Sequence, residues 1–170
     1  MGVESAIVIT AEEAEPVIGP LRMLHDTFAA RGVPAHITLL APFIPPPHVL
    51  DATDELTRFF ADVESFDFML TSVRRFPRSA YLHPHPSDVF VDLIERLLRQ
   101  WPAYPPFGGA FDTIIPHLTV AQPADRAVLD SVERVLTPKL PIHCRATAAS
   151  LLCSDESGWW VRICEFPFRS

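Results

Sequence analysis

Two tetrapeptides in the sequence combine a histidine with a threonine two residues later. They cover residues 36–39 (HITL) and 117–120 (HLTV), and the second begins 81 residues after the first. Imidazole titrates near neutral pH, with an unperturbed pKa of about 6.5, so two histidines can supply a general base and a general acid together. A threonine hydroxyl donates a hydrogen bond to a phosphate oxygen without adding charge. This combination predicts acid–base chemistry on a phosphate ester.

Both tetrapeptides lie in runs of residues that favour strands. Alternate residues of a strand share one face, roughly 6.5 Å apart, so His36 and Thr38 should point to one side while their apolar neighbours enter the core. The same holds for His117 and Thr119. If the two strands meet, both imidazoles and both hydroxyls converge in one cleft, where one histidine accepts a proton from water and the other protonates the departing oxygen. Such a reaction needs no metal. The similarity of the motifs does not decide which histidine is the base, and we start from His117 as the residue that activates water and His36 as the acid.

The surrounding patterns predict alternating strands and helices. Strands are expected at 5–10, 35–41, 67–73, 80–83 and 117–121. Helices are expected from residue 12 to Gly32, and at 49–63, 88–101 and 123–136, with a loop at 102–109. Residues 142–153 and 159–168 are expected to form a hairpin around the turn 155–158. This order predicts an α/β protein with mixed sheets.

Length and composition exclude several classes of protein. The chain has 170 residues, enough for one domain over 1–170, and no apolar run approaches the ~20 residues that span a membrane. Six glycines form neither G-x-G-x-x-G nor a P-loop. A net charge of −7 disfavours binding of DNA or long RNA, although a small anionic ligand remains possible. Three cysteines without a C-x-x-C motif indicate a reduced, cytoplasmic setting.

Other side chains are weaker candidates for substrate contacts. Arg74 and Arg75, near Arg78, form a basic cluster that suits a second phosphate or an RNA end, or simply a solvated strand end. Tyr81 and Phe107 can stack on a base or pack within the protein. His83-Pro84-His85 presents alternate imidazoles, but no nearby acidic or cysteine cluster completes a metal shell, so no metal site is expected.

The two motifs and their flanks resemble the 2H phosphoesterase superfamily, which includes the 2′-5′ RNA ligase-like proteins and cyclic phosphodiesterases. The resemblance rests on residues 34–39 (PAHITL) and 116–121 (PHLTVA), with further matches at 75–77 (RFP), 81–84 (YLHP) and 104–109 (YPPFGG). It implies a bilobal, pseudo-symmetric α/β fold of two intertwined lobes, each with one motif, around a central cleft. It also implies that His36 and His117 are catalytic and that Thr38 and Thr119 bind phosphate. Specificity elements vary within the family, so the substrate does not carry over.

We therefore expect a metal-independent phosphodiesterase that hydrolyses 2′,3′-cyclic phosphate or 2′-5′ phosphodiester bonds without a cofactor. Its partner would be a small nucleotide or an RNA terminus with a cyclic phosphate, and the protein would be a monomer that binds no membrane. Ligation, the reverse reaction, is left open. Two alternatives are a non-catalytic module that binds a nucleotide or RNA end in the same cleft, and a metallophosphatase that uses His83 and His85.

Overall fold

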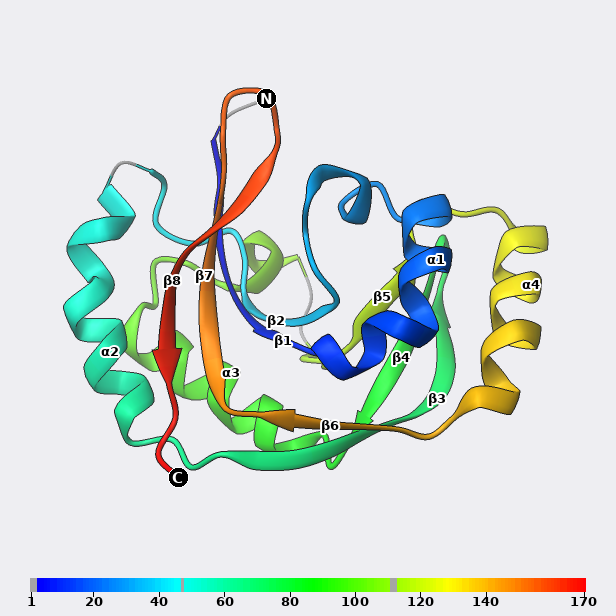
Figure 1. Cartoon of the computed structure of the whole chain (residues 1–170). Helices are drawn as coiled ribbons and strands as arrows, with labels where there is room; N and C mark the ends of the chain where they lie inside the picture. The colour runs from blue at the N-terminus through cyan, green and yellow to red at the C-terminus, as the bar shows by residue number, and fades with distance from the viewer. Residues whose placement is uncertain (1–2, 47, 111–112) are drawn as a thin grey trace.

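Two four-stranded sheets form the framework of the protein (Figure 1). The structure is a computed structural model that describes residues 3–46, 48–110 and 113–170. The first sheet has the order β2-β1-β7-β8, with strands β1 (Ser5–Thr10), β2 (His36–Leu40), β7 (Ala148–Ser154) and β8 (Trp160–Pro167). The second has the order β5-β4-β3-β6, with strands β3 (Phe66–Phe76), β4 (Ser79–His85), β5 (Leu118–Ala121) and β6 (Ile142–Ala146). Each sheet thus carries one of the two His-x-Thr motifs.

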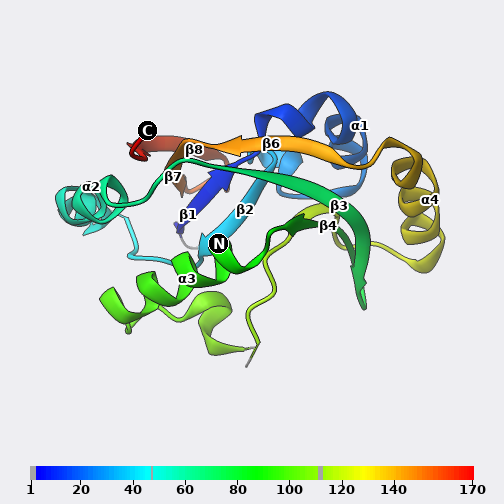
Figure 2. The same ribbon diagram turned by 90° about the horizontal axis from the view of Figure 1, so that it is seen from below.

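Four α-helices flank the sheets in two pairs. They are α1 (Glu15–His25), α2 (Thr53–Ala61), α3 (Asp88–Gln100) and α4 (Arg126–Leu136). Helices α2 and α3 lie toward the first sheet, whereas α1 and α4 lie toward the second (Figures 1 and 2). Short 3-10 turns at Glu12–Ala14, Ala29–Arg31, His48–Ala52, Pro106–Gly109 and Thr137–Lys139 complete the described elements. No helix in the described ranges is long and apolar enough to cross a bilayer.

The predicted α/β class and the alternation of strands and helices are confirmed, but the strand directions differ from the expected mixed sheets. Every strand pair within the described ranges is antiparallel. The connection through α1 explains the difference for β1 and β2, because this helix packs against β5 of the other sheet instead of crossing back over its own. A parallel pair would need the helix to cover the sheet that it connects.

Helix α1 ends at His25, earlier than the predicted end at Gly32. The end of β5 captures the chain at this point, because the backbone N–H of Gln122 donates to the carbonyl of His25 at 2.7 Å. The N–H of Thr27 then donates to the carbonyl of Gln122 at 3.1 Å. These long-range bonds replace the next helical turn, so residues 26–35 become a loop that returns to β2.

The expected strand 142–153 is divided into two strands at Thr147. Strand β6 pairs with β3 of the second sheet, whereas β7 pairs with β1 of the first and forms the predicted hairpin with β8. The burial pattern reflects the change of sheet, since residues alternate between buried and exposed in β6 but are almost all buried in β7. The expected loop at 102–109 contains the 3-10 turn Pro106–Gly109.

Gly32 fits closely against the β7–β8 hairpin. Its φ is +91°, and a Cβ built there would lie 2.9 Å from Trp159 Cε2 and from the carbonyl oxygen of Trp160. We expect Gly32→Ala to lower the free energy of unfolding in urea by about 1–3 kcal/mol, through backbone strain and this contact. Gly108→Ala is the matched control, because Gly108 also has a positive φ (+64°) but no atom within 4 Å of the added methyl. Equal losses in the two variants would contradict a role for the hairpin contact.

Candidate active-site cleft

The four motif residues line a single cavity of about 290 Å³, which we call the cleft. His36 and Thr38 come from β2, Thr119 comes from β5, and His117 directly precedes β5. The two strands belong to different sheets but contact each other. The cleft is lined by Glu4, Ala6, Val8, Asp26, Phe28, Val33, His36, Thr38, Ala41, Pro42, His117, Thr119, Gln122, Leu152 and Trp160. Two motifs far apart in the sequence therefore meet in one hollow.

Strand alternation positions the motif side chains. Ile37 is fully buried and Leu39 is 1% exposed, so the apolar residues of β2 anchor it in the core. Leu118 and Val120 are likewise fully buried on the core side of β5. The intervening histidines and threonines must then face the cleft, where each is half-buried.

Both histidines are held by the backbone in the same way. The Nδ1 of His36 lies 2.8 Å from the carbonyl oxygen of Pro34, and the Nδ1 of His117 lies 2.7 Å from that of Ile115. A carbonyl only accepts hydrogen bonds, so each Nδ1 carries a proton in the neutral ring. The unprotonated nitrogen is then Nε2, which is the atom that can accept or deliver a proton in the cleft.

Burial disfavours the protonated, positively charged form of both rings. Desolvation lowers the pKa of His36 from 6.5 to about 4, against the opposing effect of its bond to Pro34, and the charges of Arg22 and His117 lower it further. Desolvation also lowers the pKa of His117, and its bond to Ile115 opposes the shift. The effect of His117 on the pKa of His36 agrees with their placement in one cavity. At neutral pH the free cleft therefore holds neutral imidazoles.

Aromatic rings support His117 from the side of the second sheet. The Tyr81 ring is 4% exposed and stacks on Phe76 with centroids 4.5 Å apart. Both rings meet the His117 imidazole edge to face, at centroid distances of 5.4 Å from Tyr81 and 5.3 Å from Phe76. Tyr81, considered from the sequence either for base stacking or for packing within the protein, thus packs beside a motif histidine and is not among the described residues that line the cleft.

The cleft wall on the side of the first sheet is mostly apolar. Val8 lies directly opposite Thr38 in the β1–β2 pair. Phe28 is 38% exposed at the rim, and Glu4 and Asp26 are the acidic residues of the lining. A ligand in the cleft would thus meet polar motif side chains on one side and an apolar wall on the other. The apolar residues of this wall form a small cluster of their own, made up of Ala6, Val8, Val33, Leu152 and Trp160, with Ala41 packed against it.

The two arginines considered from the sequence lie on opposite faces of the second sheet. Arg75 donates to Asp130 and Glu133 of α4, away from the cleft. Arg74 is exposed, and it lies opposite Tyr81 of β4, which lies opposite Thr119 of β5. Residues that are directly opposite share a face of the sheet, so the Arg74 side chain is on the same face as Thr119, two strands away. It is not a lining residue of the cleft. The side chain of Phe107 lies outside the described part of the protein.

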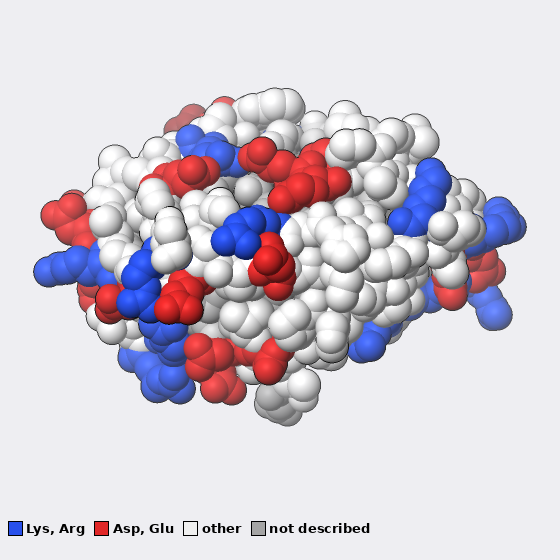
Figure 3. Space-filling view, turned by 60° about the horizontal axis from the view of Figure 1, so that its bottom comes forward, with Lys and Arg blue, Asp and Glu red and all other residues white. Residues whose placement is uncertain are grey.

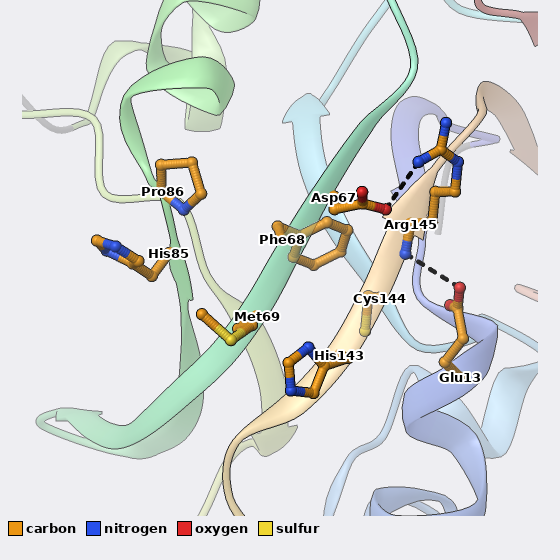
Figure 4. A pocket seen from close by; sticks show the side chains of 9 residues that line it. All are labelled: Glu13, Asp67, Phe68, Met69, His85, Pro86, His143, Cys144 and Arg145. Atoms are coloured by element: carbon orange, nitrogen blue, oxygen red, sulfur yellow. Dashed lines mark hydrogen bonds and ion pairs between the residues drawn. The ribbon is translucent and has the colours of Figure 1, made fainter. Parts of the chain in front are cut away.

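A second cavity, of about 430 Å³, lies over β3, β4 and β6 (Figure 4). Met69 pairs with His85 on one side and with His143 on the other, so two exposed imidazoles flank a thioether. Of the two histidines considered for a metal site, His85 lines this cavity and His83 does not. Within the described residues, no group of three or more His, Cys, Asp or Glu side chains could hold a metal ion.

Several cleft residues carry no signal in the sequence. Phe28 belonged to the apolar pattern of the predicted helix, and Asp26 and Gln122 have no motif around them. Adjacent strand residues face opposite sides, so the sequence predicts that one residue of the Trp159-Trp160 pair packs in the core and that the outward one borders the cleft. The structure corrects the second expectation, because the residue at the cleft is the inward one. The inward residue, Trp160, is 9% exposed and lines the cleft, while Trp159 is 51% exposed.

Comparisons with known proteins give the family and similar folds. Residues 10–158 match the model of the 2′-5′ RNA ligase superfamily. Crystal structures of E. coli LigT have a similar fold, including the complex with 3′-AMP, with a TM-score of 0.66 and 16% identity over 100% of both chains. TT0787 of Thermus thermophilus has a TM-score of 0.64 and 20% identity, covering 100% of this chain and 99% of its own. A comparison of the sequence with curated proteins gave no match. The chain belongs to the 2′-5′ RNA ligase superfamily of 2H phosphoesterases.

Proposed function

We propose that this protein is a phosphodiesterase that opens 2′,3′-cyclic phosphates, or cleaves 2′-5′ phosphodiesters, of small nucleotides or RNA ends. The observation that carries the proposal is the convergence of His36, Thr38, His117 and Thr119 on one cleft. Two imidazoles supply a base and an acid, and two hydroxyls supply neutral donors for the phosphate oxygens.

In this mechanism the starting assignment from the sequence is reversed, so that His36 is the base and His117 is the acid. The His36 ring has a pKa of about 4, so its Nε2 is available to take a proton from water near neutral pH. A bound phosphate anion raises the pKa of His117, so its Nε2 takes up a proton from solvent when the substrate binds. The water oxygen then attacks phosphorus, the bond from phosphorus to the ribose oxygen breaks in line, and Nε2 of His117 gives this proton to that oxygen. The product is a phosphomonoester, and exchange with solvent returns both rings to their starting states. Thr38 and Thr119 hold the non-bridging oxygens.

The surroundings of the cleft favour a small or terminal substrate. The described lining residues include two carboxylates but no lysine or arginine. Apart from the cleft, the underside of the molecule shown in Figure 3 has interspersed basic and acidic residues, without the broad basic surface that a long RNA would need. The apolar wall suits a nucleobase or ribose. Arg74 shares the face of Thr119 two strands away, and we assign it to a second phosphate of a longer ligand. The complexes of E. coli LigT with 3′-AMP, ATP and NADP+ support a nucleotide-sized ligand for this cleft.

Hydrolysis of 2′,3′-cyclic AMP in the presence of EDTA tests the proposal, and we expect turnover that EDTA does not change. The dependence of kcat/KM on pH should be bell-shaped. The rate rises through about pH 4 as His36 loses its proton, and it falls again as His117, whose pKa is lowered from 6.5, loses its own. The profile of kcat should lie at higher pH, because a bound phosphate anion raises the pKa of both rings.

The alternative functions predict different results. Calorimetric binding of the cyclic nucleotide without hydrolysis would indicate a non-catalytic module. Loss of activity on adding EDTA would indicate metal-dependent chemistry and would refute the two-histidine mechanism. A panel of 2′,3′-cyclic nucleotides, 2′-5′ dinucleotides, ADP-ribose cyclic phosphate and cyclic-ended RNA then identifies the preferred ligand. Product analysis decides between 2′ and 3′ phosphates, and incubation of RNA ends decides between cleavage and ligation.

A further inference from the structure

A buried ion-pair network lies between α1 and the segment that leads into β2. The Arg22 side chain is 2% exposed, and its Nη2 donates to Asp26 Oδ2 at 2.9 Å and to the carbonyl oxygen of Val33 at 3.1 Å. Its Nη1 lies 3.5 Å from Glu15 Oε1. A buried guanidinium is costly unless its donors are paired. Here both Nη atoms are paired, through contacts that reach from the helix to the backbone just before His36, whereas the buried Nε has no hydrogen-bond partner among the described residues.

The network fixes the backbone of the three residues that directly precede His36. The carbonyl of Val33 accepts from Arg22, and the N–H of Ala35 donates to Glu15 Oε1 at 2.6 Å. Between them, the carbonyl of Pro34 accepts from His36 Nδ1 at 2.8 Å. The orientation of the imidazole therefore depends on a peptide segment that is held on both sides by the Arg22–Glu15 pair.

The same network also contributes to the electrostatic environment of the His36 ring. After burial, which is the largest cause, the positive charges of Arg22 on α1 and His117 on β5 lower the pKa of His36. Glu15 and Asp26 complete the charged set on the α1 side, where both are bound to the guanidinium.

We propose that Arg22 is a positioning residue for His36. It fixes the backbone that orients the imidazole, and its own positive charge disfavours a positive charge on the nearby ring. The catalytic part of this inference rests on the proposed function. The orientation and protonation of His36 can be measured without any substrate.

Two variants separate the two effects of Arg22. Arg22→Lys keeps the charge but loses the planar fork, in which Nη1 faces Glu15 while Nη2 bonds to Asp26 and Val33. We expect kcat for 2′,3′-cyclic AMP to fall by roughly 10- to 100-fold while the acidic limb of the pH profile stays in place. The double variant Arg22→Met with Asp26→Asn removes both charges without leaving a buried ion unpaired. We expect the same loss of kcat together with a shift of the acidic limb from about pH 4 toward 6.5.

Imidazole ¹⁵N chemical shifts report the pKa and the tautomer of His36 independently of catalysis. The wild type should show the Nδ1–H tautomer, neutral down to about pH 4. The double variant should titrate at higher pH, and a folded double variant with unchanged pKa and tautomer would overturn the inference. If wild-type protein turns over no cyclic phosphate at all, the proposed function fails, while these shifts still decide the role of Arg22.

A variant at the rim of the network guards against loss of folding. Glu15 is 39% exposed, so Glu15→Ala removes the clamp on Ala35 while Arg22 keeps its bond to Asp26. It should lower kcat and disturb the tautomer of His36, and wild-type values of both would also refute the positioning role. Arg75→Met is the matched control, because Arg75 likewise pairs with two carboxylates but faces α4. Its kcat, pH profile and His36 shifts should be unchanged.

Discussion

Replacing either motif histidine with asparagine is expected to lower kcat for 2′,3′-cyclic AMP by roughly 10²- to 10⁴-fold. The Asn amide nitrogen takes the place of Nδ1, so His36→Asn can still donate to Pro34 and His117→Asn to Ile115. What disappears is Nε2, the atom assigned to proton transfer. Because the two rings act in one step, the kcat of the double variant should be little lower than that of the less active single variant. Steady-state kinetics and thermal unfolding of the three variants measure these effects.

The second cavity provides controls for these substitutions. His85 and His143 are exposed strand histidines outside the cleft, so His85→Asn and His143→Asn should keep wild-type kcat and thermal stability. A folded His36→Asn or His117→Asn variant with near-normal turnover would falsify the two-histidine mechanism. Equal losses in the cleft variants and the control variants would show that the effect is not specific to the cleft.

Replacing either motif threonine with valine is expected to lower kcat/KM for the same substrate by roughly 10- to 100-fold. Valine has nearly the shape of threonine but lacks the hydroxyl, so the variant loses one hydrogen bond to a charged phosphate, worth about 1.5–3 kcal/mol. The core anchoring of the two strands should persist, since Ile37 and Val120 are untouched and fully buried. Kinetics of Thr38→Val and Thr119→Val across substrate concentration separate the change in KM from the change in kcat.

Serine variants control for the threonine prediction. Thr38→Ser and Thr119→Ser restore the hydroxyl without the methyl group, and most of the activity should return. If serine and valine variants lost activity equally, packing of the methyl group would explain the result. In that case the two hydroxyls would not be donors to the phosphate.

Local periodicity predicted most elements but not the places where distant segments interrupt them. The β-branched run at 5–10 and the apolar spacing at 88–101 correspond to β1 and α3 within a residue or two. Helix α1 was predicted too long, because the pattern up to Phe28 is helical but long-range bonds to Gln122 end the helix at His25. Residues 142–153 were predicted as one strand, because nothing local reveals that β6 and β7 pair in different sheets.

The sequence by itself determined that an imidazole and a hydroxyl share one face in each motif, because a strand alternates its side chains whatever surrounds it. Only the tertiary structure decided that the two faces line one cleft, because β2 and β5 belong to separate sheets that meet through packing. It also turned Arg75 toward α4 and placed Arg22, which reads as an ordinary helix residue, behind His36. Such contacts join residues far apart along the chain, and local sequence patterns do not encode them.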